Sequence, residues 1–235
     1  MEKLSILIPA YNEGKTIAKI LDEVLKTSIA GAEKEIIVVD DGSTDSTKGV
    51  LATYGKKRIK GLKIVHHGKN KGKGAAIKTG IAHATGDIIL IQDADLEYHP
   101  REYPKLLNPL LDKRAKVVYG SRIEAIKRNL GQMYFLHYIG NRFLSLAASI
   151  LYGQAISDME TGYKAFRREV IVGMPLRSRR FDIEPELTAK ICRRGYSIVE
   201  VPIDFFGRSF KEGKKITWKD GLVALWVLLK YRFVD

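Results

Sequence analysis

The stretch Ile88-Ile-Leu-Ile-Gln-Asp-Ala-Asp-Leu-Glu97 joins an apolar run to three closely spaced carboxylates. The run at residues 88–91 is typical of a buried strand. Asp93, Asp95 and Glu97 follow at alternate positions, and in an extended chain such side chains point to the same side. Three oxygen donors at this spacing suit Mg²⁺ or Mn²⁺, which usually share a substrate's phosphates. The alternative is a solvated acidic turn at the end of a strand.

The segments around this strand alternate between strand and helix patterns. Apolar runs predict strands at residues 4–8, 35–40, 62–65, 86–91 and 116–119, with helices at about 17–25, 74–84 and 102–113. This alternation predicts an α/β fold with a mainly parallel central sheet and helices on both faces. Ligands of such sheets bind beyond the carboxyl ends of the strands, where Asp40, Asp93 and Gly120 fall.

The second half of the chain is less regular. It predicts helices at residues 138–152, 184–194 and 217–231, and strands at 162–166 and 197–205. Pro202 within the last strand indicates an edge position or a bulge, because proline cannot donate to a neighbouring strand. We expect a domain at residues 1–206 with two halves, at 1–122 and 123–206. A basic loop and a C-terminal helix would follow at 207–235.

The charge balance favours an anionic partner, with a heat-loving source as the alternative explanation for part of the lysine content. The chain has 235 residues, and 40 Lys and Arg against 27 Asp and Glu give a net charge of +13. Nucleic acid, an anionic membrane and a phosphorylated substrate are the candidate partners. Nucleic acid is the weakest of these, because no motif of a nucleic-acid-binding module accompanies the charge.

Composition also bears on the cellular location. The single cysteine, Cys192, excludes a disulfide within the chain and favours a reducing compartment. No apolar run reaches the ~18–20 residues of a membrane span. The first residues lack the apolar region of a signal peptide. We therefore expect a cytoplasmic protein that is soluble or lies at the membrane surface, and that does not cross the membrane.

A polar segment follows the first predicted strand. Pro9-Ala-Tyr-Asn-Glu13 stands where a dinucleotide-binding fold would carry Gly-x-Gly-x-x-Gly, so a nicotinamide or flavin enzyme is disfavoured. Tyr11 is suited to stacking on a base, and Asn12 or Glu13 to bonding the base edge or the ribose. The alternative is that Asn12 caps a helix.

Two further polar segments follow the second and third strands. In Val38-Val-Asp-Asp-Gly-Ser-Thr-Asp45, either Asp40 or Asp41 could accept a hydrogen bond from a nucleobase or a ribose hydroxyl. The glycine-rich run at residues 66–74 enters a helix, and helix N-termini bind anions. Lys73 would then contact a diphosphate, although a solvated basic loop is an equal alternative.

In this order, the segments 9–13, 38–45, 70–75, 93–95 and Gly120-Ser-Arg122 resemble the family 2 inverting glycosyltransferases with the GT-A fold. Gln92-Asp-Ala-Asp-Leu-Glu-Tyr-His-Pro100 looks like the branch of dolichol-phosphate mannose synthase and polyprenyl-phosphate glucosyltransferases. The resemblance covers nearly the whole chain and is weakest at residues 123–157. It implies that residues 1–122 are the nucleotide-sugar half of the domain and residues 123–206 the acceptor half.

The resemblance implies a role for each matching residue. The nucleotide site would be lined by Pro9, Tyr11, Glu13 and Asp40, and the metal on the diphosphate would be held by Asp93 and Asp95 with Glu97. Arg122 would approach phosphate or sugar, and Arg208 would bind the acceptor's phosphate. Glu160 or Asp158 would be the base for a hydroxyl acceptor, whereas a phosphate acceptor needs none. Residues 213–215 depart from the family's Gly-x-Ser-Lys pattern.

The resemblance implies transfer of a hexose, mannose or glucose, from GDP-mannose or a UDP-glucose type donor to dolichyl or another polyprenyl phosphate, with inversion. One alternative is transfer to a hydroxyl of a glycan or lipid. Another is a basic membrane- or nucleic-acid-binding module without catalysis. Apolar helices near residues 143–152 and 222–229 would rest in the membrane interface or pack in the core.

Overall fold

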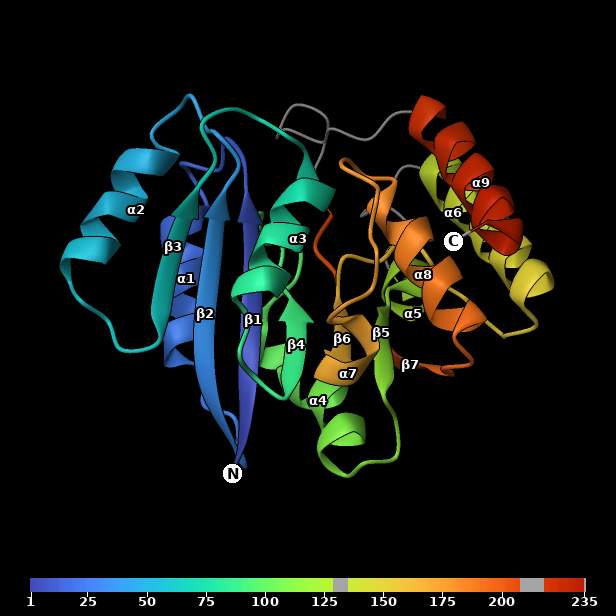
Figure 1. Ribbon diagram of the computed structural model, residues 1–235, viewed down its shortest axis with the longest axis horizontal. Helices are drawn as coiled ribbons and strands as arrows, with labels where there is room; N and C mark the ends of the chain where they lie inside the picture. The colour runs from blue at the N-terminus through green and yellow to red at the C-terminus, as the bar shows by residue number, and fades with distance from the viewer. Residues whose placement is uncertain (129–134, 208–217, 235) are drawn as a thin grey trace.

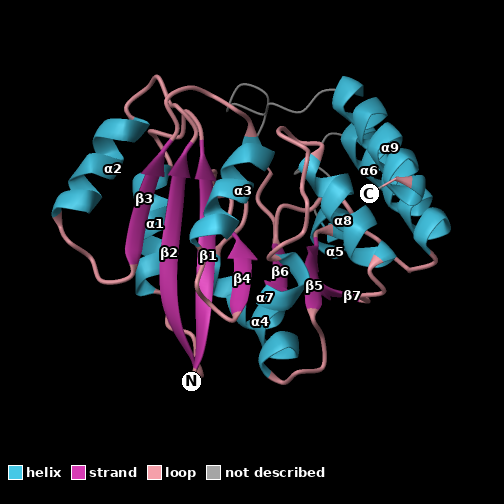
Figure 2. Cartoon of the chain, in the orientation of Figure 1, coloured by secondary structure: helices cyan, strands magenta, loops and turns pink. Residues whose placement is uncertain are grey.

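The computed structural model describes residues 1–128, 135–207 and 218–234. Within these residues a seven-stranded sheet has the order β3-β2-β1-β4-β6-β5-β7, and helices cover both of its faces (Figures 1 and 2). The predicted α/β class is therefore confirmed. The strands are β1 (Glu2–Ala10), β2 (Ala32–Asp40), β3 (Leu62–His66), β4 (Ile88–Ile91), β5 (Val117–Ser121), β6 (Lys164–Arg167) and β7 (Ile198–Pro202).

Among the described residues, six helices lie close to the predicted ranges, whereas the helices at residues 47–56 and 123–128 had no predicted range. The main ones are α1 (Ile17–Lys26), α2 (Thr47–Lys56), α3 (Lys73–His83), α4 (Tyr103–Leu111), α5 (Ile123–Arg128), α6 (Phe135–Tyr152), α8 (Ile183–Arg193) and α9 (Trp218–Phe233). A short 3-10 turn, η1 (Pro100–Glu102), precedes α4, and the four-residue α7 (Arg168–Ile171) follows β6.

The sheet is parallel except at one strand. β1 pairs in parallel with β2 and β4, β2 with β3, and β5 with β7, whereas β6 runs antiparallel between β4 and β5. The prediction that the strand with Pro202 lies at an edge is confirmed, because β7 ends the sheet. The antiparallel β6 was not evident from the sequence.

Alternate residues of the central strands supply two cores. On one face, Ile6 and Leu90 pack with the helices α1, α2 and α4; on the other, Leu7 and Ile91 pack with α3, α6, α8 and α9. A strand covered on both faces is apolar throughout, which explains the uninterrupted run Ile88–Ile91. Because β1, β2 and β4 are parallel and packed between helices on both faces, their carboxyl ends lie together at one edge of the sheet.

Candidate functional site

A cleft of about 1540 Å³ opens at the carboxyl ends of these strands, the upper edge of the sheet in Figure 1. Most of the predicted site residues line it: Pro9, Tyr11, Glu13, Asp41, Lys73, Asp93, Asp95, Glu97, Arg122 and Glu160. Asp40 and Asp158 are buried behind its surface. Arg208 lies outside the described residues.

The segment after β1 is fixed to the turn after β2. Asn12 adopts a left-handed backbone conformation with φ of 55°. Its amide N–H donates to Ser43 Oγ at 3.0 Å, and its Oδ1 accepts from the Thr44 N–H at 2.8 Å. Asn12 is therefore not a helix cap, since α1 begins only at Ile17. Its bonds hold the neighbouring Tyr11 and Glu13 at the cleft.

The two aspartates after β2 have different surroundings. Asp40 Oδ1 accepts from the Ser43 N–H at 3.0 Å, and Asp40 Oδ2 lies 2.9 Å from His66 Nδ1. Burial opposes ionisation, but the hydrogen bonds from Ser43 and the contact with His66 outweigh it and keep the pKa of Asp40 below its ordinary value. With Asp40 beneath the surface, Asp41 is the member of the pair that reaches the cleft.

Asp41 holds the loop that leads into α3. Its Oδ1 lies 2.6 Å from His67 Nδ1, and its Oδ2 accepts from the Gly72 N–H at 2.7 Å and the Lys71 N–H at 3.1 Å. These contacts occupy both carboxylate oxygens. Asp41 therefore positions the 69–72 loop over the cleft, a role that its place in the sequence did not indicate.

The glycines of this loop serve a close backbone contact. A Cβ on Gly72 would lie 2.3 Å from the Arg179 carbonyl oxygen, and one on Gly74 would lie 2.9 Å from that of Ser178. The Gly74 and Ala75 N–H groups donate to the Arg180 and Arg179 carbonyls at 3.2 and 3.1 Å. Because backbone carbonyl oxygens already accept from these two N–H groups, neither is available to an anion. The prediction of an anion site at this helix N-terminus is therefore wrong for these two groups.

The carboxylates after β4 do not stand on extended chain. The strand ends at Ile91, and Leu96 is left-handed with φ of 65°. Asp95 Oδ1 accepts from the Glu97 N–H at 3.2 Å, as in a turn. Across the described ranges, no three or more Asp, Glu, His or Cys side chains form a group that could hold a metal ion. All three carboxylates line the cleft, but the chain turns after Asp93 and they do not form such a group.

Lys73 lies between Asp93 and a glutamate that the sequence reasoning missed. Lys73 Nζ lies 2.8 Å from Asp93 Oδ1 and 3.1 Å from Glu184 Oε1. Burial would lower the pKa of Lys73, but the two carboxylates raise it above its ordinary value. Glu184 occupies the buried face of α8 together with Leu187 and Ile191. A carboxylate at a core position of an amphipathic helix needs a nearby cation. That position of Glu184 is the sequence signal that could have identified it as a site residue.

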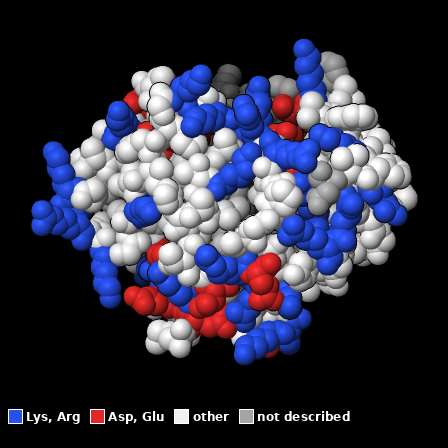
Figure 3. Space-filling model, viewed as in Figure 1, with Lys and Arg blue, Asp and Glu red and all other residues white. Residues whose placement is uncertain are grey.

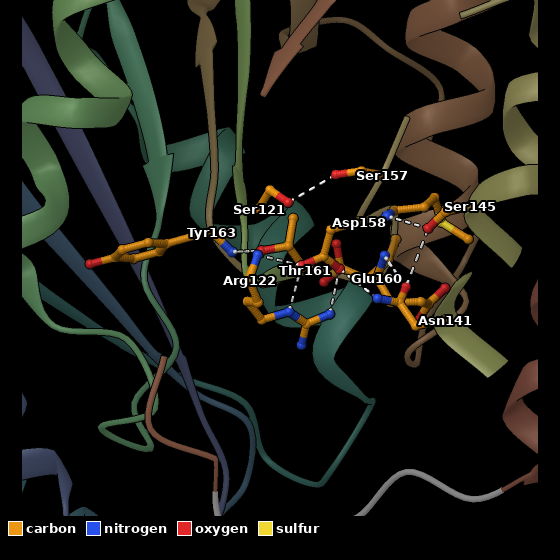
Figure 4. Close-up of polar contacts among 12 residues, drawn as sticks. Ser121, Arg122, Asn141, Ser145, Ser157, Asp158, Glu160, Thr161 and Tyr163 are labelled. Atoms are coloured by element: carbon orange, nitrogen blue, oxygen red, sulfur yellow. Dashed lines mark hydrogen bonds and ion pairs between the residues drawn. The ribbon is translucent and has the colours of Figure 1, made fainter. Parts of the chain in front are cut away.

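A buried ion pair joins β5 to the loop before β6 (Figure 4). Arg122 Nε and Nη2 donate to Asp158 Oδ2 at 2.8 Å and Oδ1 at 2.6 Å, and the Arg122 N–H also donates to Oδ2 at 2.8 Å. Asn141 of α6 donates to Asp158 Oδ1 at 2.7 Å. Burial opposes ionisation of Asp158, but Arg122 and these bonds keep its pKa low. Asp158 is therefore occupied in fixing Arg122.

Glu160 is the acid that faces the cleft. Its Oε1 is buried and accepts no hydrogen bond from the residues that the structure describes. Its N–H donates to Asn141 Oδ1 at 3.3 Å, which ties it to α6. Burial, followed by the nearby charge of Glu184, raises the pKa of Glu160 to about 7. A carboxyl with that pKa is suited to accepting a proton near neutral pH, so Glu160 fits the role of base better than Asp158.

Solved structures resemble this chain over nearly its full length. Glucosyl-3-phosphoglycerate synthase from Mycobacterium tuberculosis, crystallised with Mn²⁺ and UDP-glucose, superposes with a TM-score of 0.75 at 22% identity, covering 98% of this chain and 79% of that one. The same enzyme with Mg²⁺ and UDP gives a TM-score of 0.73 at 21% identity, covering 100% of this chain and 80% of that one. The likeness shows that the fold is GT-A.

Two curated relatives have greater sequence identity. Glycosyltransferase AglJ of Haloferax volcanii is 31% identical over 208 residues, 88% of this chain and 64% of that protein. Dolichyl-phosphate beta-glucosyltransferase ALG5A of Trichomonas vaginalis is 31% identical over 217 residues, 86% of this chain and 65% of that protein. The chain thus spans slightly less than two thirds of the length of either relative.

A family model described as Glycosyl transferase family 2 matches residues 5–173. The match runs from β1 to the end of α7 and includes the cleft residues from Pro9 to Glu160. Because it covers more than half of the sequence and contains most of the site, the chain belongs to glycosyl transferase family 2.

Proposed function

We propose that the chain transfers a hexose from a nucleoside diphosphate sugar to the phosphate of a polyprenol such as dolichol, with inversion at the anomeric carbon. The observation that carries this proposal is Arg122, a buried guanidinium that lines the cleft and is locked by Asp158. A planar guanidinium held in one orientation suits recognition of a phosphate. The 31% identity to a dolichyl-phosphate beta-glucosyltransferase supports the same acceptor class.

The carboxylates at the end of β4 are suited to a divalent ion that also binds the phosphates of the substrate. Asp93 and Asp95 line the cleft at the end of β4, and Mg²⁺ is usually held by one or two carboxylates together with substrate phosphates. We propose that these two residues would hold Mg²⁺ or Mn²⁺ against the donor's diphosphate, with Glu97 outside the set. When bound, the ion would neutralise charge on the departing nucleoside diphosphate.

The transfer itself needs little from the protein beyond position and charge. An oxygen of the acceptor phosphate forms a bond to the anomeric carbon while the bond from that carbon to the diphosphate oxygen breaks, and the electron pair leaves with the diphosphate. A phosphate acceptor is already an anion, so no proton has to be removed. Arg122 would orient it, and Lys73 would balance negative charge on the diphosphate side of the cleft. Arg208, outside the described residues, remains a proposed second contact to the acceptor phosphate.

One observation favours a second candidate function, transfer to a hydroxyl group. Glu160 faces the cleft with an oxygen that accepts no hydrogen bond from the described residues and with a pKa of about 7, which suits the base that a hydroxyl acceptor requires. Glu160→Gln separates the two functions. Transfer to a phosphate should change less than about tenfold, whereas loss of a general base should cost roughly 10²–10⁴-fold.

The proposed function is tested with a panel of donors. GDP-mannose, UDP-glucose and UDP-N-acetylglucosamine are each incubated with the protein, Mg²⁺ or Mn²⁺ and a short polyprenyl phosphate, and products are followed by mass. The matched control acceptor is the same polyprenol without its phosphate. We expect one donor to give a glycosylated polyprenyl phosphate and no product with the control. Equal transfer to the free alcohol would contradict the proposed acceptor.

The pKa of Glu160 also predicts how stability depends on pH. Its folded value of about 7 lies above its ordinary value of 4.5. The protonated carboxyl of Glu160 therefore contributes fully to the free energy of unfolding below pH 4.5. This contribution is lost as the pH rises through 7. Because Gln does not titrate, Glu160→Gln should gain about 2–3 kcal/mol of unfolding free energy relative to wild type between pH 4.5 and pH 8.

The measurement for Glu160→Gln is urea unfolding of both proteins at the two pH values. Glu124→Gln, at an exposed position on α5, is the control variant for loss of a carboxylate. If Glu160→Gln and wild type differ by the same amount at both pH values, the carboxyl is not held protonated in the fold.

Helices α6 and α9 together expose an apolar surface. Large side chains at four-, three- and four-residue spacing form one stripe on each helix: Ile139, Phe143, Leu146 and Ile150 on α6, and Leu222, Trp226, Leu229 and Phe233 on α9. The opposite faces of both helices pack in the core. In the space-filling view, uncharged surface covers the right edge, where α6 and α9 lie, with Lys and Arg beside it (Figure 3).

We propose that this apolar stripe rests in the interface of an anionic membrane. Exposed Arg142, Lys219 and Arg232 belong to the same two helices, and cations beside an apolar face favour anionic lipid. Among the described residues, no helix combines the length and apolar character that a membrane span requires. We also propose that α9, in the predicted appendage at residues 207–235, faces the membrane; residues 208–217 and 235 lie outside the described residues.

Replacing Phe143 and Trp226 with Asp should weaken binding to vesicles of phosphatidylcholine and phosphatidylserine by more than about tenfold. Each large apolar side chain contributes roughly 1.5–3 kcal/mol on burial, and tenfold corresponds to about 1.4 kcal/mol. Vesicle co-sedimentation measures the effect, with Val172→Asp as the control, because Val172 is exposed but lies outside both helices. Unchanged vesicle binding, or a stripe found buried in a dimer by analytical ultracentrifugation, would contradict the assignment.

A further inference from the structure

The carboxylate of Asp93 is enclosed on two sides. Lys73 Nζ contacts both of its oxygens, at 2.8 Å for Oδ1 and 3.0 Å for Oδ2. On another side it lies against Gly162, where an added Cβ would be only 2.1 Å from Asp93 Oδ2. The ammonium group of Lys73 therefore already contacts both oxygens that a second cation would need.

Glu184 gives Lys73 a second carboxylate. The Glu184 side chain is 4% exposed and also pairs with Lys164, whose side chain is fully buried. Lys164 in turn donates to the carbonyl oxygens of Met159 and Thr161. Glu184 is thus fixed in place by Lys164, and its Oε1 lies 3.1 Å from Lys73.

This arrangement makes Lys73 costly to displace without a replacement anion. The side chains of Lys73 and Asp93 are each 16% exposed, and separating the members of a largely buried ion pair leaves charges without partners. A diphosphate entering the cleft would offer Lys73 new anionic oxygens. A divalent ion without a diphosphate gives Lys73 no replacement anion, so the ion has to compete with Lys73 for Asp93.

We propose that Lys73 is an internal counter-cation for Asp93 that makes divalent-ion binding depend on the donor's diphosphate. The proposal rests on the proposed function, because that function assigns a divalent ion to Asp93 and Asp95. Without nucleotide, Lys73 keeps Asp93 neutralised and the ion binds weakly. With nucleotide, Lys73 shifts its contact to the diphosphate, and both oxygens of Asp93 become available. Glu184, held by Lys164, keeps Lys73 at the cleft in both states and is a positioning residue.

Mn²⁺ binding, measured by isothermal titration calorimetry and by electron paramagnetic resonance of free Mn²⁺, tests the proposal without an activity assay. In the absence of nucleotide, Lys73→Met should bind Mn²⁺ at least tenfold more tightly than wild type. Lys71→Met is the matched control, since it removes the same charge from the same cleft and Lys71 is not the partner of Asp93. The control should stay within twofold of wild type.

Addition of UDP, or of GDP in a parallel series, should strengthen Mn²⁺ binding less in Lys73→Met than in wild type. Lys73→Gln, whose amide still donates a hydrogen bond to Asp93, is the second variant if Lys73→Met does not fold. Equal Mn²⁺ affinity of the folded Lys73 variant and wild type, without nucleotide, would overturn the proposal.

The outcomes distinguish this proposal from the proposed function. If wild type binds Mn²⁺ tightly without nucleotide and still transfers sugar, the role of Lys73 is wrong and the transferase stands. If Mn²⁺ does not bind even with UDP or GDP while transfer continues in EDTA, the metal assignment itself is wrong. Absence of transfer from every donor, with Mn²⁺ binding as expected, would count against the acceptor and not against Lys73.

Discussion

Arg122→Met is expected to destabilise the fold by about 3–5 kcal/mol, because it leaves the carboxylate of Asp158 buried without its cation. Asp158 has no exposed surface, and Arg122 supplies three of its hydrogen bonds. The backbone N–H bond would survive the substitution, but both bonds from the guanidinium and its charge would be lost. Removing one member of a buried pair is more damaging than replacing both.

Urea unfolding of Arg122→Met against wild type measures this loss. Arg142→Met is the control, since Arg142 is exposed and donates one bond, to the Ser157 carbonyl at 2.8 Å; we expect a change of less than about 1 kcal/mol. The double variant Arg122→Met, Asp158→Leu should recover part of the stability, because no unpaired charge remains. A single variant as stable as wild type would mean that the pair is not a buried contact in solution.

Asp93→Asn is expected to reduce sugar transfer by about 10³-fold or more, which corresponds to roughly 4 kcal/mol of transition-state stabilisation. Asn keeps the shape of the side chain but lacks the charge that the proposed ion requires. The overall fold should survive, because the substitution preserves the volume at the end of β4. Lys73 would retain Glu184 as a partner.

Initial rates of transfer, with Mg²⁺ or Mn²⁺ and with EDTA, measure the effect of Asp93→Asn. Asp95→Asn should cause a loss of similar size. Glu97→Gln should lose less than about tenfold, because the proposed site assigns the ion to Asp93 and Asp95 and leaves Glu97 outside the set. Circular dichroism and thermal melting confirm that each variant is folded. Full activity of wild type in EDTA would remove the metal from the mechanism.

Local patterns in the sequence determined most of the framework. The apolar run Ile88–Ile91 identified a strand covered on both faces, and α/β alternation set the class of fold, because side-chain periodicity depends only on neighbouring residues. Pro202 identified an edge strand for an equally local reason, since it lacks an N–H group. The polar segments after successive strands also located the cleft, because parallel strands bring their carboxyl ends to one edge.

Only the tertiary structure decided which polar groups meet within that cleft. Lys73, Asp93 and Glu184 come from α3, the turn after β4 and α8, and nothing in their sequence spacing brings them together. The turn after Asp93 separates the carboxylates that an extended chain would have aligned. Gly72 and Gly74, which suggested a phosphate loop, instead admit the backbone at residues 178–180. Periodicity sets which face of an element is buried, whereas contacts between charges depend on how distant elements pack.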